Sequence, residues 1–258
     1  MANSTLSNAK AAKKDEFYTM FYDIETEMEA YLDYNPNVFR GKTVLLPCDD
    51  PEWSNFTKYF AQNFEALGLK KLISTSYAIN SKVIKAGIQT SFLETTSPKF
   101  DKSKTNTHGK IFVLEKDNTG DGKINLEDLE WDYLEGDGDF RSEEVKKLRD
   151  EADIIVTNPP FSLFREFLAW IVEADKQFII LGNINCITYK EVFPLFKYNK
   201  MWLGVTNFNR GMFFRVPDDF EYAPTYKFDK EINGIKVNRV AGICWYTNIE
   251  HGRRHHPL

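Results

Sequence analysis

The sequence lacks the features by which secreted, zinc-binding and membrane-spanning proteins are identified. Its three cysteines, Cys48, Cys186 and Cys244, lie far apart without a Cys-x-x-Cys pair, which argues against a disulfide framework or structural zinc and favours a reducing cytoplasm. No run of about 18 apolar residues is present, so we expect no membrane-spanning helix. Residues 1–14 are polar, without the apolar core of a secretory signal, and we expect a disordered tail.

An excess of positive charge is also missing. The net charge is −5, which is unusual for a protein that binds nucleic acid. However, residues 115–151 hold 14 acidic and 6 basic residues, a net charge of −8, so the remainder of the chain carries +3. An acidic lobe on a mildly basic remainder is compatible with a local DNA-binding face.

Helix and strand patterns alternate along the chain, as is typical of an α/β protein. With 258 residues, of which 42% are hydrophobic and 28% charged, the chain can form a soluble domain with a full core. The alternation predicts a Rossmann-like, doubly wound and mostly parallel sheet with a terminal antiparallel hairpin. Strands are expected at 43–46, 71–77, 153–157, 177–182 and 200–205, helices at 15–34, 56–67, 142–149, 162–174 and 188–198, and the antiparallel pair at 211–216 and 240–246.

The most informative segment is Asn158-Pro159-Pro160-Phe161, which directly follows an apolar strand and precedes a helix pattern. A planar amino nitrogen such as N6 of adenine is a poor nucleophile, because its lone pair is delocalised into the ring. The Asn158 side-chain oxygen and the Pro159 carbonyl can bind its two N–H groups, prolines stiffen the loop, and Phe161 can stack on a flipped base. The segment therefore predicts methyl transfer to an amino nitrogen, although a turn with a proline stop is the simpler structural alternative.

The tetrapeptide alone does not identify the substrate. Adenine in DNA, a base in RNA and the side-chain amide of a protein glutamine all present a planar amino group. A non-catalytic module that binds calcium or DNA on a decayed fold of this kind is a further alternative.

Other segments resemble the adenine-specific DNA methyltransferases of the EcoRI type, in the same order along the chain. The resemblance covers most of the sequence and is weakest from about residue 80 to residue 134. It implies transfer of a methyl group from S-adenosylmethionine to N6 of a flipped adenine in double-stranded DNA. The segments are Asp15-Glu16-Phe17-Tyr18-Thr19, Cys48-Asp49-Asp50-Pro51, Ser54-Asn55-Phe56, Gly136-Asp137-Gly138-Asp139-Phe140-Arg141-Ser142 and Thr188-Tyr189-Lys190-Glu191-Val192-Phe193.

The resemblance also assigns roles to individual residues. It implies that Tyr18 and Thr19 line the methionine end of the cofactor, although they could equally form an ordinary exposed helix turn. Asp139 and Phe140, expected at the end of a strand, would contact the cofactor's adenine, and the alternative is a Gly/Asp turn. The implied catalytic residues are Asn158, Pro159, Pro160 and Phe161, and the implied cofactor residues are Tyr18, Thr19, Cys48, Asp49, Asp50, Pro51, Asp139 and Phe140.

The Cys48–Pro51 loop departs from the glycine-rich turn that many methyltransferases have after the first strand. Because S-adenosylmethionine carries a cationic sulfonium and an amino group, a carboxylate of Asp49 or Asp50 is a reasonable partner. The alternative is an acidic turn that caps the next helix. Which of the two aspartates has which role stays open.

The same resemblance sets the expected organisation and partners. We expect a catalytic domain at 15–205 with a variable insertion at about 80–134, followed at 206–258 by the end of the sheet and the start of a target-recognition region that the chain leaves incomplete. Candidate DNA contacts are Arg210, Arg215 and Lys227. We expect a monomer that forms no stable complex with a cognate restriction endonuclease sharing its target, and whether such an endonuclease exists stays open.

Residues 117–128 partly fit an EF-hand calcium loop. Asp117, Asp121 and Asp128 stand at positions one, five and twelve, but position twelve lacks the usual glutamate and flanking helices are absent. Calcium binding is therefore an alternative to a polar β-turn in an acidic hairpin at 110–134.

Overall fold

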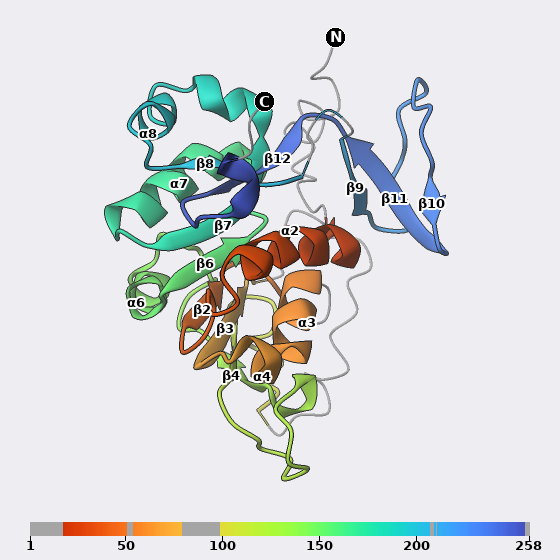
Figure 1. Cartoon of the computed structure of the whole chain (residues 1–258). Helices are drawn as coiled ribbons and strands as arrows, with labels where there is room; N and C mark the ends of the chain where they lie inside the picture. The colour runs from red at the N-terminus through yellow and green to blue at the C-terminus, as the bar shows by residue number, and fades with distance from the viewer. Residues whose placement is uncertain (1–17, 51–53, 79–98, 207–208, 210, 256–258) are drawn as a thin grey trace.

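The main element of the fold is an eight-stranded sheet. The structure is a computed structural model that describes residues 18–50, 54–78, 99–206, 209 and 211–255. The strand order is β5-β4-β3-β2-β6-β7-β12-β8; the central strands β3, β2, β6 and β7 are parallel and the outer ones pair antiparallel (Figure 1). The bounds are β2 (Thr43–Leu46), β3 (Lys71–Ser76), β4 (Lys110–Leu114), β5 (Glu130–Tyr133), β6 (Ile154–Thr157), β7 (Gln177–Asn183), β8 (Trp202–Leu203) and β12 (Ile243–Thr247).

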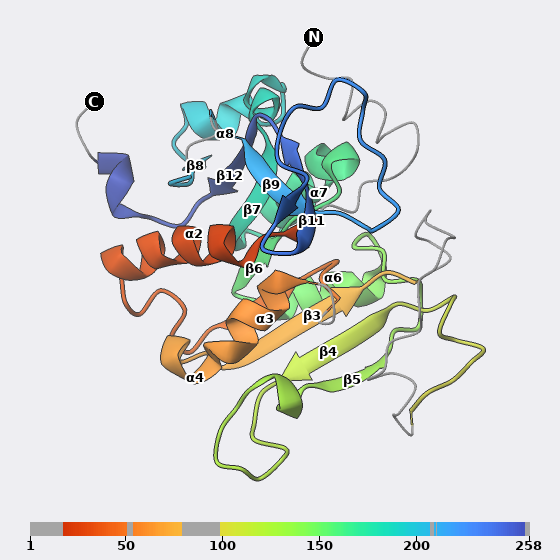
Figure 2. The ribbon, with the colours of Figure 1, turned by 90° about the vertical axis from the view of Figure 1, so that its right-hand side faces the viewer.

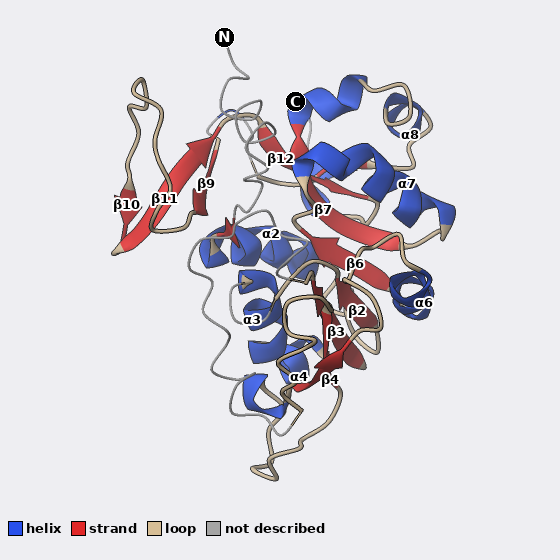
Figure 3. Cartoon of the chain, turned by 180° about the vertical axis from the view of Figure 1, so that it is seen from behind, coloured by secondary structure: helices blue, strands red, loops and turns tan. Residues whose placement is uncertain are grey.

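Helices cover both faces of this sheet (Figure 3). Along β6, Ile154 and Val156 join the core on one face while Ile155 joins the core on the other, because side chains alternate along a strand. The first core is closed by α2 (Phe21–Tyr34), α3 (Asn55–Gln62) and α4 (Phe64–Leu67), and the second by α6 (Glu143–Glu151), α7 (Phe164–Glu173) and α8 (Phe193–Lys197). The protein is thus a layered α/β structure, and among the described residues no helix is long and apolar enough to cross a membrane.

A second, four-stranded antiparallel sheet projects beside the main body (Figures 1 and 2). Its order is β1 (Tyr18–Thr19), β9 (Met212–Arg215), β11 (Ile235–Val240) and β10 (Glu231–Ile232). The expected pairing of 211–216 with 240–246 is therefore wrong, because β9 pairs with β1 and β11 whereas β12 pairs with β7 and β8. All five residues of β12 are buried, as a strand inside a covered sheet requires.

Most other elements lie where the sequence predicts them. Ser142 caps α6 by accepting from Val145 N at 3.2 Å, and β4 and β5 form the predicted hairpin. The predicted helix at 15–34 begins only at Phe21, because Tyr18 and Thr19 pair with β9. The helix at 188–198 is shorter than predicted and starts at Phe193, with Pro194 in its first turn. Much of the expected insertion, 79–98, lies outside the described residues.

Candidate active site

The candidate site lies where the parallel sheet changes direction. The chain passes from β2 to β3 on one side and from β6 to β7 on the other, while β2 and β6 pair directly. In open α/β sheets, ligands bind outside the carboxyl ends of the strands at such a switch point. The loop after β2 and the Asn-Pro-Pro-Phe segment after β6 meet here, because Thr157 Oγ1 bonds the Pro47 carbonyl at 2.7 Å.

Asn158 to Phe161 form the turn between β6 and the helical segment that follows. Asn158 is half-buried, with its Oδ1 atom shielded from solvent, and comes directly after the last residue of β6. Phe161 opens the 3₁₀ helix η3 (Phe161–Leu163) that leads into α7. Its half-buried ring meets the ring of Phe214 on β9 edge to face, with centroids 6.3 Å apart. The small sheet therefore forms one wall beside the predicted catalytic segment.

The two aspartates of the other loop differ in their surroundings. Asp49 is only 6% exposed; its Oδ1 accepts from Ser54 Oγ at 2.7 Å and its Oδ2 lies 2.5 Å from Thr157 Oγ1. Burial raises the pKa of Asp49 to about 7, helped by the charge of Asp50 and opposed by the hydrogen bonds that its side chain makes with Thr157 and Ser54. Asp50 is half-buried. The carboxyl of Asp49 is thus bonded into the scaffold, which leaves Asp50 as the candidate for ligand contact.

The turn that carries these aspartates is strained. Cys48 has φ +72°, a left-handed conformation that is uncommon for residues other than glycine. Its backbone N–H bonds Thr75 Oγ1 at 3.4 Å, and the Asp49 carbonyl accepts from both Thr57 Oγ1 and Ser74 Oγ. Hydrogen bonds from β3 and α3 therefore hold Cys48 in a backbone conformation that a glycine would adopt more easily. Pro51 lies outside the described residues.

Two buried polar side chains flank Phe214 on the small sheet. Thr19 and Asn238 pair with Phe214 from opposite sides, so the three side chains share one face. Thr19 is 3% and Asn238 1% exposed, and within the described part of the chain Thr19 Oγ1 and Asn238 Nδ2 have no hydrogen-bond partner. The Thr19 carbonyl accepts from Asn55 Nδ2 at 2.8 Å, which ties β1 to the start of α3. Asn238 was not predicted, because it stands two residues after Lys236 on β11 and therefore has the sequence pattern of a solvent-facing residue.

The Asp139-Phe140 pair lies in a turn before α6, so its expected position at the end of a strand is wrong. Gly138 brings this turn against the end of β3: it has φ +85°, and a Cβ there would stand 2.5 Å from the Ser76 carbonyl oxygen. Tyr77 OH accepts weakly from Phe140 N at 3.5 Å. The turn therefore does reach the carboxyl edge of the parallel strands, through close packing of its backbone.

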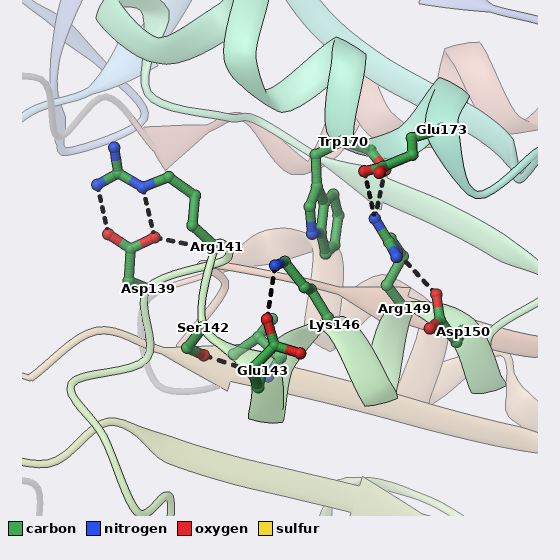
Figure 4. Close-up of polar contacts among 10 residues, drawn as sticks. Asp139, Arg141, Ser142, Glu143, Lys146, Arg149, Asp150, Trp170 and Glu173 are labelled. Atoms are coloured by element: carbon green, nitrogen blue, oxygen red, sulfur yellow. Dashed lines mark hydrogen bonds and ion pairs between the residues drawn. The ribbon is translucent and has the colours of Figure 1, made fainter.

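The side chains of this turn point to different environments. Asp139 forms a two-pronged ion pair with Arg141, at 2.9 Å to Nε and 2.5 Å to Nη2 (Figure 4). These hydrogen bonds from Arg141 lower the pKa of Asp139 and keep it charged. Phe140 is 1% exposed and packs edge to face on Phe167 and Trp170. Its ring thus belongs to the core, and its contact with the cofactor's adenine stays a prediction.

In the EF-hand-like segment, the aspartate side chains accept hydrogen bonds from backbone N–H groups of the same segment. Asp128 accepts from the N–H groups of Asn118, Thr119 and Asn125, and Asp117 accepts from those of Gly120 and Gly122. Asp121 accepts from Lys123 N at 2.8 Å. Within the described ranges no group of three acidic, histidine or cysteine side chains is arranged to hold a metal. The geometry is that of a polar turn between β4 and β5.

Two of the three predicted DNA contacts, Arg215 and Lys227, lie on the small sheet and its loop. Arg215 is half-buried on β9, one position after Phe214 and hence on the opposite face, and Lys227 is exposed in the segment between β9 and β10. Arg210 lies outside the described residues. On the same outer face, the Arg239 guanidinium lies 4.2 Å from the centre of the Phe228 ring.

Fold and site together define an α/β protein with a candidate ligand-binding edge at the switch point of its parallel strands. The family model described as adenine-specific methyltransferase EcoRI matches residues 5–258, and the chain belongs to this family. The predicted family is therefore confirmed.

Three curated relatives are similar to the chain over nearly its whole length. The Type II methyltransferase M.EcoRI of Escherichia coli is 42% identical over 99% of this chain and 72% of its own length. M.MpnI of Mycoplasma pneumoniae is 36% identical over 95% of this chain and 64% of its own length, and M.MgeORF184P of Mycoplasma genitalium 34% over 97% and 66%. The chain thus spans about two thirds of the length of the two mycoplasma relatives. No solved structure matches it.

Proposed function

We propose that this chain transfers a methyl group from S-adenosylmethionine to N6 of an adenine flipped out of double-stranded DNA. The observation that carries this proposal is the position of Asn158-Pro159-Pro160-Phe161: it directly follows β6 at the switch point, beside the loop that carries Asp50. Membership in an adenine-specific methyltransferase family supports DNA over RNA or protein as substrate. In this proposal the layered α/β body is a Rossmann-like methyltransferase fold.

The chain's own residues position the adenine amino group. Asn158 Oδ1 and the Pro159 carbonyl accept its two hydrogens, which favours a pyramidal nitrogen with a more available lone pair. The nitrogen loses a proton after the new bond forms, so no general base is needed before attack. Phe161, supported edge-on by Phe214, stacks on the base, and the amide of Asn238 hydrogen-bonds to a ring nitrogen.

The residues at the edge fit the cofactor. S-adenosylmethionine supplies the methyl group on a positively charged sulfonium. The Asp50 carboxylate complements the positive charge of the ligand, and the Thr19 hydroxyl, buried without a partner among the described residues, offers a hydrogen bond at the methionine end. The turn of Asp139 closes the edge at the end of β3.

Substitution of Asn158 by alanine tests the proposal. We expect the methylation rate on an adenine-containing duplex to fall about 10²–10³-fold, because one oriented acceptor is lost, while calorimetry shows unchanged affinity for S-adenosylmethionine. Gln62→Ala, which truncates an exposed amide on α3, is the matched control and should leave the rate unchanged. Full activity of Asn158→Ala would refute the role of the segment, and methyl transfer to RNA or protein in place of DNA would refute the substrate.

A further inference from the structure

We propose that Asp49 is a positioning residue, protonated in the folded protein, whose carboxylic acid joins the loop after β2 to the loop after β6. Asp49, Ser54 and Thr157 are called the switch-point latch below. The role rests on the proposed function, because Asp50 and Asn158 are the groups that the latch aligns.

Within the described part of the chain, no cation pairs with this buried acid. It is 6% exposed, and Ser54 and Thr157, its side-chain partners, are 4% and 0% exposed. The carboxyl group itself bonds two uncharged hydroxyls, that of Ser54 just before α3 and that of Thr157 on β6. The hydroxyls of Thr57 on α3 and Ser74 on β3 donate to the backbone carbonyl of Asp49. The charged group that acts on it is Asp50, whose negative charge also favours the neutral acid.

The count of hydrogens favours a proton on Asp49. The Pro47 carbonyl, 2.7 Å from Thr157 Oγ1, can only accept, so it takes the single hydroxyl hydrogen of Thr157. Ser54 Oγ accepts from Phe56 N at 3.1 Å and gives its hydrogen to Asp49 Oδ1. The contact of 2.5 Å between Asp49 Oδ2 and Thr157 Oγ1 then has a hydrogen only if the acid donates it, and this length is typical of a strong O–H···O bond.

The latch connects the two halves of the proposed site. Thr157 immediately precedes Asn158, and Asp49 immediately precedes Asp50, so one hydrogen bond fixes the two loops although 108 residues separate its partners. The same loop contains Cys48 in its strained conformation, which surrounding contacts must hold. Loss of the latch lets the Asn158 loop and the Asp50 loop move independently, and misplacement of about 1 Å costs about 10²-fold in rate.

Kinetics of three variants test the positioning role. In Asp49→Asn the amide N–H donates to Thr157 and the amide oxygen accepts from Ser54, so we expect a kcat within about threefold of the parent. Asp49→Ala and the isosteric Thr157→Val break the latch and should lower kcat about 10²-fold with little change in KM for S-adenosylmethionine. Where the kcat of the parent changes between pH 6 and 8 because Asp49 loses its proton, the kcat of Asp49→Asn should not change. If Asp49→Asn is as slow as Asp49→Ala, or Thr157→Val is as fast as the parent, the role is refuted.

Infrared spectroscopy tests the proton independently of activity. Infrared spectra of the parent and of Asp49→Asn are recorded over the same pH range and subtracted. The difference spectrum should contain the carbonyl band of one protonated carboxylic acid, and this band should disappear as pH rises through neutrality. The subtraction removes Asp23 and Glu27, the other carboxyls whose pKa burial raises. Absence of the band would refute a protonated Asp49. If the parent methylates no DNA, the proposed function fails, whereas the infrared result still decides the protonation state.

Discussion

Replacement of Asp49 by asparagine should change how the stability of the protein depends on pH. Burial raises the pKa of Asp49 from 3.8 to about 7 in the folded state. Between these two values the folded protein holds a proton that the unfolded chain has released, so the free energy of unfolding falls as pH rises. This stabilising effect is fully present below the unfolded pKa and is lost as pH passes through the folded pKa.

The size of the effect follows from the shift. One unit of pKa corresponds to about 1.4 kcal/mol, so the full loss amounts to roughly 4 kcal/mol, and about 2 kcal/mol of it falls between pH 5 and pH 6.5. Asparagine has no such proton. Relative to Asp49→Asn, the parent should therefore lose stability at about 1.4 kcal/mol per pH unit in this window, and the difference should become constant above about pH 8.

Urea denaturation monitored by tryptophan fluorescence, repeated in half-unit steps from pH 5 to pH 8, measures this difference. Asp128→Asn is a control of the opposite sign: backbone N–H groups, that of Asn125 first, lower the pKa of Asp128, so its contribution is lost only as pH falls below about 4. The free energies of Asp128→Asn and the parent should thus run parallel from pH 5 to pH 8. A parallel course for Asp49→Asn and the parent, or a parent that gains stability with pH relative to the variant, would refute a buried neutral acid.

Two further substitutions test the edges of the site. Gly138→Ala should destabilise the protein by about 2 kcal/mol in urea denaturation, because Gly138 has a positive φ and a Cβ there would meet the Ser76 carbonyl. The control Gly136→Ala, which has open space around it, should cost less than about 0.5 kcal/mol. Equal costs for the two variants would contradict the close packing at Gly138. Asn238→Leu removes a buried amide whose Nδ2 atom has no partner among the described residues, so it should raise the free energy of unfolding by about 1 kcal/mol and weaken binding of the DNA substrate. Unchanged DNA binding would exclude Asn238 from the base site.

The sequence predicted those parts of the fold that depend on local pattern. Buried strands such as β2 and β6 are continuous apolar runs, and Ser142 is a serine placed just before a helix, so both are visible in a short window. The Asn158 segment was placed correctly at the carboxyl edge for the same reason: a strand precedes it and a helical segment follows. The predicted pairing of β12 was wrong, because an apolar run indicates that a strand is buried but does not indicate which strands lie beside it.

The different surroundings of Asp49 and Asp50 could not be predicted from the sequence. The two residues are adjacent and chemically identical, and they are distinguished by the hydroxyl of Thr157, which is 108 residues away from Asp49. Phe140 illustrates the same limit, because its burial against Phe167 and Trp170 depends on how α6 and α7 pack on the sheet. Long-range contacts decide which member of a motif faces a ligand and which faces the core.

Buried polar groups around the switch point fall into two kinds, and the distinction suggests which of them meet a ligand. Both carboxyl oxygens of Asp49 are hydrogen-bonded within the protein. Thr19 Oγ1 and Asn238 Nδ2 are equally buried but, within the described residues, have no such partner, and each such group costs about 1–3 kcal/mol in the free protein. A cofactor that hydrogen-bonds to Thr19 and a base that hydrogen-bonds to Asn238 would remove that cost. The groups around Phe214 thus favour binding through ligand contacts, whereas Asp49 acts by holding the two loops in place.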